Sequence, residues 1–132
     1  MIALVLVAAA AAAAPPPKVT IASMQGRARV LILSAPREDD PALRRQREEL
    51  GRWRRGAEAR DLHVVTVAGP KVHGASDGSL RLRLRYRLAF RGFTAVLIGK
   101  DGGVKLRRDR PIPIRELEAA IDAMPMRKAG LR

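Results

Sequence analysis

Two short runs of branched apolar residues predict buried strands. Residues 28–34 (ARVLILS) and 62–68 (LHVVTVA) lack the alternation of a half-exposed strand and suit strands that are covered on both faces. Between them, Asp40-Pro41 is typical of a helix start. The helical stripe that follows consists of Leu43, Gln46, Leu50, Trp53 and Ala57. A strand, a helix and a second strand in this order favour a crossover that pairs the two strands in parallel.

The second half of the chain predicts a hairpin and a final helix. A strand is expected over 94–98 and a returning strand over 104–107, joined by Asp101-Gly102-Gly103, which tolerates the positive φ of a tight turn. A phosphate-binding loop would instead need Gly-Lys-Ser/Thr at a helix start, and this motif does not follow the glycines. The last helical stripe, which Pro125 is expected to end, consists of Ile114, Leu117, Ile121 and Met124.

Residues 80–88 (LRLRLRYRL) fit two kinds of element. Their strict alternation is that of a half-buried strand, which the local pattern slightly favours. Leu80, Leu84 and Leu88 nevertheless share one face of a helix, and leucine and arginine both form helices readily. The pattern alone leaves both alternatives open.

The first residues are apolar and uncharged. Residues 1–14 are too short to span a bilayer and have the length of the apolar part of an export signal. Export signals usually begin with basic residues, and this segment contains none, so an uncleaved anchor or a plain alanine-rich leader stays an alternative. We expect an exported protein, periplasmic or associated with the cell envelope. A linker is expected over 15–26, one domain over 27–128 and a basic tail over 129–132.

The charge of the chain is strongly positive. Its 132 residues, enough for one domain, carry a formal net charge of +13, and 21 of the 26 basic residues are arginines. A surface selected for polyanions would produce this excess. Compositional drift is the alternative, because the arginines spread along the whole chain. There is no cysteine, which excludes disulfides, thiolate nucleophiles and cysteine-bound metals.

Three segments resemble a known family. They are LILSAPREDDPALRRQ, FTAVLIGKDGGVKLR and AIDAMPMRK, and the resemblance covers about residues 27–128. They are similar to a bacterial domain-of-unknown-function family that is related to the peroxiredoxin-like domain of animal secreted sushi-repeat and coiled-coil-domain proteins. The resemblance implies a thioredoxin-like α/β fold, with a mixed sheet of about four strands and helices on both faces, and frequent export. It also favours a helix over 80–88, and we adopt that prediction.

The resemblance implies that a reactive thiol would follow the first buried strand. Glu38 and Pro41 lie near the thiol positions, and Thr94 lies where a cis-proline would pack against them. Because the chain has no cysteine, dithiol exchange and cysteine peroxidase activity are excluded. Glu38, Asp39, Asp40 and Thr94 are candidates for a vestigial site, whose acids could hold a hard cation or act as acid and base. Asp40 is better explained as a helix cap, and the other acids as charges that favour the helix start.

Two groups of basic residues are candidates for anion binding, and a solvated face is the alternative for both. The first group has no acid among its members and consists of Arg81, Arg83, Arg85, Arg87 and Arg91. The second group consists of Lys105, Arg107, Arg108 and Arg110. His63 and His73 each stand alone in the sequence, so neither indicates a metal site or a catalytic base.

These observations lead to three functional hypotheses. The first is a non-catalytic exported binding or structural module that engages another protein or an acidic envelope component, with peripheral membrane contact as one form of binding. The second is an enzyme of unknown reaction that uses the region of Glu38, Asp39 and Thr94. The third is a polyanion-binding protein, which would act in the cytosol if residues 1–14 are not a signal. The absence of a stacking motif and the expected export argue against nucleic acid as the polyanion. No cofactor is predicted.

Overall fold

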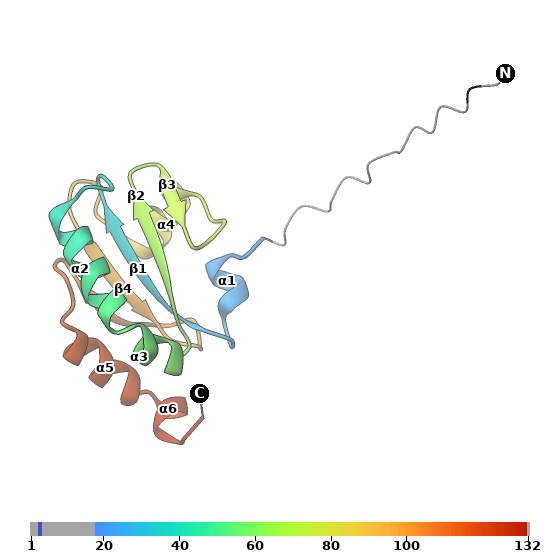
Figure 1. Cartoon of the computed structure of the whole chain (residues 1–132), viewed down its shortest axis with the longest axis vertical. Coiled ribbons are helices and arrows are strands. Elements are labelled where there is room, and N and C mark those ends of the chain that lie inside the picture. Colours follow the sequence, from blue (N-terminus) through green and yellow to red (C-terminus); the bar gives the residue numbers. More distant parts are fainter. Residues whose placement is uncertain (1–2, 4–17, 132) are drawn as a thin grey trace.

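A mixed sheet lies between two layers of helices in the computed structural model, which describes residues 3 and 18–131 (Figure 1). Its strand order is β3-β2-β1-β4-β5. The central strand β1 (Arg29–Ala35) pairs in parallel with β2 (Leu62–Ala68) and antiparallel with β4 (Thr94–Ile98). The edges are β3 (Lys71–His73) and β5 (Val104–Arg108), both antiparallel to their neighbours. The α/β class and the parallel pairing are confirmed.

Helices cover both faces of the sheet. On one face lie α2 (Pro41–Arg52), α3 (Arg54–Ala59) and α5 (Ile114–Asp122). On the other face lie α1 (Ile21–Met24) and α4 (Ser79–Tyr86). The short helix α6 (Pro125–Lys128) follows α5. Pro125 therefore begins a helix, whereas α5 already ends at Asp122.

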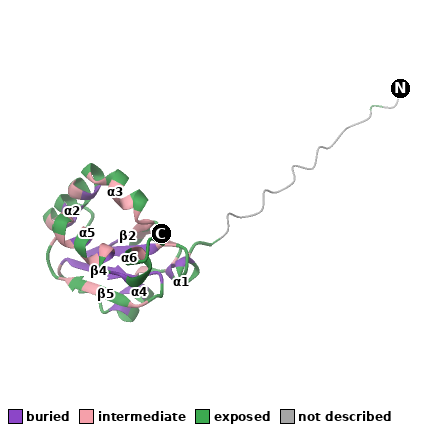
Figure 2. Ribbon diagram, turned by 90° about the horizontal axis from the view of Figure 1, so that it is seen from below, coloured by how far each residue is buried: buried purple, intermediate pink, exposed green. Residues whose placement is uncertain are grey.

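The two central strands are buried along their whole length. All seven residues of β1 and all five of β4 are buried, as expected for strands with helices on both sides. Figure 2 shows the buried sheet between helices whose outward faces are exposed. The even-numbered apolar residues of β1 pack towards α4, and the odd-numbered ones pack towards α2 and α5.

The sheet has one strand more than the four expected. The additional strand, β3, lies in the segment 69–79 that the sequence indicates as a loop. It contains three residues, none of them buried, so no apolar pattern marks it. Backbone pairing with Thr66–Ala68 holds it in place, after a turn at Gly69 with a φ of +56°.

Residues 18–26 belong to the folded domain, although they fall in the expected linker. Thr20 caps α1, accepting a hydrogen bond from the Ser23 backbone N–H at 3.1 Å. The side chains of Ile21 and Met24 are buried in the core beside α4. The expected export signal over 1–14 lies outside the described residues except for Ala3. None of the helices in the described part of the chain has the length and apolar character needed to cross a membrane.

Residues 79–86 form the helix α4, which confirms the prediction of a helix in this region. The buried face differs from the expected leucine stripe, because Leu82, Arg83 and Tyr86 are the helix residues that turn inwards. Leu80 and Leu84 are 61% and 66% exposed. The helix ends at Arg87, which adopts the left-handed conformation with a φ of 53°. The chain therefore changes direction before Leu88.

The hairpin expected between the last two strands is confirmed. Gly99 donates its N–H to the carbonyl of Gly103 at 2.9 Å, and Gly102 has a φ of +83°. Asp101 accepts a hydrogen bond from the Gly103 N–H at 2.9 Å, which fixes the turn. A strand and not a helix follows these glycines, so they do not form a phosphate-binding loop.

A single buried amide ties α2 to the segment between β5 and α5. The fully buried side chain of Gln46 donates to the carbonyl of Ile112 at 3.0 Å and accepts from the Ile112 N–H. Ile112 is itself fully buried. Its backbone groups have no access to water, so Gln46 replaces the hydrogen bonds that a strand or helix would provide.

We therefore expect Gln46→Leu to lower the free energy of unfolding by about 2–4 kcal/mol, because it leaves two buried backbone groups unpaired. Urea denaturation followed by circular dichroism would measure the change. Arg47→Leu, at the exposed neighbouring position, is the control and should stay within about 0.5 kcal/mol of the wild type. Equal stabilities of the two variants would contradict the assigned role of Gln46.

Candidate functional site

The three acids after β1 each have a different partner. Asp40 is the N-cap of α2 and accepts from the N–H groups of Ala42 at 3.0 Å and Leu43 at 3.2 Å. Asp39 pairs with Arg37 at 2.8 Å, and both side chains are exposed. Glu38 binds His73 and therefore points towards β3. The carboxylates thus do not converge, and residues 3 and 18–131 contain no group of three or more acids, histidines or cysteines that could hold a metal ion.

The contact between Glu38 and His73 joins two segments that are 35 residues apart in the sequence. His73 Nε2 and Glu38 Oε1 are 2.6 Å apart at the surface. The hydrogen bond from His73 is the main cause that lowers the pKa of Glu38 from its ordinary value of 4.5. The sequence could not indicate this pair, because it depends on the unpredicted strand β3. His63 also has a local partner, with its Nε2 2.6 Å from the carbonyl oxygen of Gly74.

Thr94 forms its hydrogen bond with a different residue and lines a pocket that the three acids do not line. It is buried at the start of β4, opposite Ser34 of β1, and its hydroxyl accepts from the Ala89 N–H at 3.1 Å. The pocket that Thr94 lines contains none of the three acids. No peptide bond is cis in the part of the chain that the structure describes, so Thr94 does not reproduce a cis-proline. The three acids of the vestigial-site hypothesis therefore do not share with Thr94 the pocket that it lines.

Arg83, a member of the first basic group, is a buried structural residue. Only 5% of it is exposed, and its guanidinium donates to the carbonyls of Ala89 at 2.8 Å, Ala35 at 3.0 Å and Gly69 at 3.3 Å. Its Nε–H donates to the hydroxyl of Ser79 at 3.3 Å. Burial lowers the pKa of Arg83. These bonds fasten α4 to the carboxyl ends of β1 and β2, and they remove Arg83 from the surface that an anion could reach.

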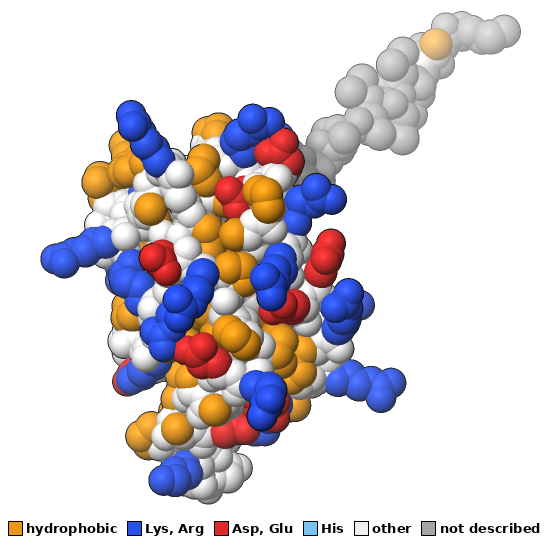
Figure 3. All heavy atoms as spheres, turned by 90° about the vertical axis from the view of Figure 1, so that its left-hand side faces the viewer, with side chains coloured by type: hydrophobic (Ala, Val, Ile, Leu, Met, Phe, Trp, Pro, Cys, Tyr) orange, Lys and Arg blue, Asp and Glu red, His pale blue; other side chains and the backbone are white. Residues whose placement is uncertain are grey.

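The other four arginines of the first group are exposed. They are Arg81, Arg85, Arg87 and Arg91, and no described acid pairs with any of them. The sequence from residue 79 to residue 99 contains no acid at all. The side of the molecule that carries α2 and α5 is different, since acidic side chains are interspersed with the basic ones there (Figure 3). The segment on and after α4 thus carries positive charge with no acid in its own sequence, whereas the exposed arginines of α2 and α3 that have no ion pair, such as Arg44 and Arg47, lie among acids.

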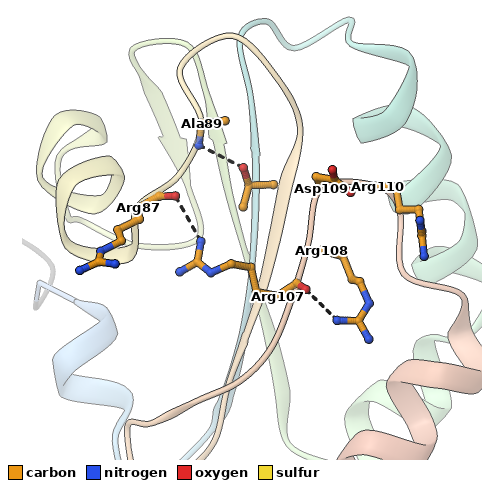
Figure 4. A pocket seen from close by; sticks show the side chains of 7 residues that line it. Arg87, Ala89, Arg107, Arg108, Asp109 and Arg110 are labelled. Atoms are coloured by element: carbon orange, nitrogen blue, oxygen red, sulfur yellow. Dashed lines mark hydrogen bonds between the residues drawn. The ribbon is translucent and has the colours of Figure 1, made fainter.

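The second basic group meets the first group at the end of α4. Arg107 reaches from β5 and donates to the carbonyls of Tyr86 and, at 3.2 Å, Arg87. The two groups share an open pocket of about 450 Å³ (Figure 4). Its lining residues are Arg87, Ala89, Thr94, Arg107, Arg108, Asp109 and Arg110. The guanidinium of Arg108 is partly neutralised by Glu116 at 2.6 Å. The pocket keeps an excess of positive charge, because Asp109 is the one acid among its lining residues.

Three large apolar side chains are exposed among the unpaired arginines. Leu80 and Leu84 lie on α4, and Phe90, which is 58% exposed, follows it. Phe90 stacks on the guanidinium of Arg83, with 5.4 Å between the carbon Cζ and the ring centre. We call this surface the α4 face; its residues are Leu80, Arg81, Leu84, Arg85, Arg87, Phe90 and Arg91. It combines accessible apolar area with arginines that form no ion pair with an acid of residues 18–131.

A family model matches most of the chain. The model, described as "Domain of unknown function (DUF4174)", matches residues 20–130. The match begins at the N-cap of α1 and includes the whole α4 face. No curated protein matches the chain.

Replacement of Arg83 is expected to destabilise the fold. Arg83→Met should lower the free energy of unfolding by about 2–4 kcal/mol, because the carbonyls that Arg83 serves would lose their donors. Arg81→Met removes the same charge from an exposed position and should change the stability by less than about 0.5 kcal/mol. Urea denaturation would compare the two variants. If they are equally stable, Arg83 does not fasten α4 to the sheet.

The contact with His73 is expected to control the ionisation of Glu38. His73→Ala should raise the pKa of Glu38 towards 4.5, and Lys71→Ala should raise it less. Because the pKa is lower in the folded protein, the contact stabilises the fold above about pH 4.5 and is lost as the pH falls through the lowered value. An NMR titration of the side-chain carboxyl carbons would measure both shifts. An unchanged pKa in the His73 variant would contradict the assignment.

Proposed function

The chain belongs to the family described as "Domain of unknown function (DUF4174)", and we propose that it is a non-catalytic module of the cell envelope that binds an anionic membrane surface through its α4 face. The observation that carries this proposal is the mixture of exposed leucines and unpaired arginines on one short helix. Leu80 and Leu84 expose most of their surface beside Arg81 and Arg85. Helices that lie in the membrane interface combine exposed apolar residues with lysine or arginine, and α4 exposes residues of both kinds.

Electrostatics and apolar contact support the proposal together. Anionic lipids attract basic residues near the surface by about 1 kcal/mol for each residue. Leucine and phenylalanine side chains add apolar area that can enter the boundary between headgroups and acyl chains. Phe90 extends the apolar part of the α4 face beyond the end of the helix. The α4 face therefore offers both contributions that peripheral membrane binding requires.

The surrounding fold holds the α4 face in one orientation. α4 has only eight residues, too few for a stable isolated helix. Leu82 and Tyr86 pack on the sheet, Arg83 bonds to three carbonyls at its end, and Arg107 binds the last carbonyls of the helix. The exposed residues are thus presented by a rigid domain, and no ordering of the helix is needed on binding.

Two further features favour a binding role in the envelope. The apolar segment 1–14 has the length of an export signal, and export would bring the domain to membrane surfaces and acidic polymers outside the cytoplasm. The acids near the predicted thiol positions are used for a helix cap and surface ion pairs. A non-catalytic function therefore accounts for more of the observed contacts than an enzymatic one.

Flotation with lipid vesicles tests the proposal. The full chain should bind phosphatidylglycerol-containing vesicles, and phosphatidylcholine vesicles would report any contribution of the apolar leader. Replacement of Arg81, Arg85, Arg87 and Arg91 by Gln should lower the affinity by about two to three orders of magnitude, since four basic contacts are lost. Leu80→Ser combined with Leu84→Ser should weaken the binding that remains at high salt. Arg83 is left unchanged in both variants because it is buried.

The matched control lies on the opposite face of the molecule. Replacement of Arg44, Arg47, Arg52 and Arg55 by Gln also removes four exposed positive charges, from α2 and α3. This variant should keep most of the affinity of the wild type. An equal loss in both variants would show that net charge alone attracts the vesicles, and the proposal would be wrong.

A further inference from the structure

A second region of positive charge lies at the start of the central strand β1, on the side of the sheet that carries α5. There, the start of β1, the β4–β5 hairpin and the segment between α5 and α6 enclose a small pocket of about 110 Å³. Its lining residues include Arg29, Lys100, Asp101, Lys105, Met124 and Met126. None of them belongs to the α4 face, so this pocket is independent of the proposed membrane contact.

Arg29 is a buried cation whose hydrogen-bonding capacity is only partly used. It is 1% exposed. Its Nη1 donates to the carbonyl of Arg60 at 2.8 Å, and its Nε donates to the sulfur of Met124 at 3.3 Å. A thioether is a weak acceptor, and no residue in the described ranges accepts from Nη2. Among the described residues, the buried side-chain atom without a partner is Ser34 Oγ and not a nitrogen of Arg29, so Nη2 keeps access to solvent at the cavity, where an acceptor from outside the chain could bind it.

Other cations surround the same cavity. Lys100 is 9% exposed, and its Nζ lies 2.8 Å from Asp61, which is not a lining residue. Lys105 pairs with Asp101 at 2.7 Å. The lining residues contribute three positive charges and one negative charge, and Asp61, which pairs with Lys100, reduces the excess to one positive charge. Such an excess, close to a low-dielectric wall of methionine and proline, attracts an anion more strongly than the same charges would in water.

We propose that this Arg29 pocket binds a small oxyanion, a carboxylate or a phosphate, for which Arg29 supplies the hydrogen-bond donors and Lys100 and Lys105 supply further charge. The volume supports an occupant of this size, because 110 Å³ is the space of roughly three to four waters at about 30 Å³ each. Met124, Pro125 and Met126 form the apolar side of the pocket. This side would contact any short carbon chain that the anion carries.

Methionine methyl groups allow a direct test. In the full chain with ¹³C-labelled methionine methyl groups, titration with inorganic phosphate or acetate should give saturable shifts of the Met124 and Met126 signals. Met24, which is buried on the other face of the sheet, should not shift. Sodium chloride at the same ionic strength is the reference. Saturation by phosphate alone would support a multiply charged ligand, and saturation by acetate would support a carboxylate.

Two substitutions make the test specific without disturbing buried residues. Met126 is 41% exposed at the pocket, and Met126→Glu should lower the affinity for the bound anion by about tenfold or more through charge repulsion. In this variant Met124 remains as the reporter. Leu80→Glu makes the same change of charge at an exposed site on α4 and should leave the affinity unchanged. Non-saturating shifts, shifts equal to those with chloride, or full affinity of Met126→Glu would overturn the proposal.

Discussion

The hydrogen bonds of Arg83 determine how one whole side of the molecule is arranged. A guanidinium that is removed from water has to find acceptors, and here no carboxylate lies nearby. The acceptors are backbone carbonyls at the ends of β1 and β2 and in the segment after α4. The carbonyls of Ala35 and Gly69 are held at the ends of β1 and β2, so their bonds to Arg83 fasten α4 at that edge of the sheet. The exposed leucines and arginines of α4 are a direct consequence of that position.

The need of buried polar groups for hydrogen-bond partners also explains which parts of the fold could be predicted from the sequence. The apolar residues of β1 and β2 do not alternate strictly with polar ones, and this pattern predicts strands that are covered on both faces. Asp40-Pro41 and Asp101-Gly102 also predict their structures, since capping and positive φ are local properties. The buried face of α4 could not be predicted. The apolar leucines predict a buried stripe, but Arg83 turns inwards instead. It does so because backbone carbonyls of distant segments accept its hydrogen bonds, and these partners come together only in the folded protein.

The candidate site also contains features that the sequence indicates and features that only the structure shows. The sequence indicates both basic groups, and the structure adds that Arg107 joins them and that Arg83 does not belong to the surface. The pair of Glu38 and His73 and the Arg29 pocket were not predicted, because each consists of residues that come together only after distant segments pack. The relationship to thioredoxin-like proteins stays a prediction from resemblance. It would explain why the loop after β1 carries polar side chains, but the contacts of these side chains are those of a helix cap and of surface ion pairs.

The outer edge of the sheet has a consequence for the behaviour of the protein at high concentration. β5 is an edge strand, so the backbone groups on its outer side are not used by a neighbouring strand. Lys105 and Arg107 are exposed along this strand. If β5 strands from two molecules came together, these cations would be brought close to one another and would repel. Basic residues on an edge strand are one of the features that disfavour its pairing with a strand of a second copy.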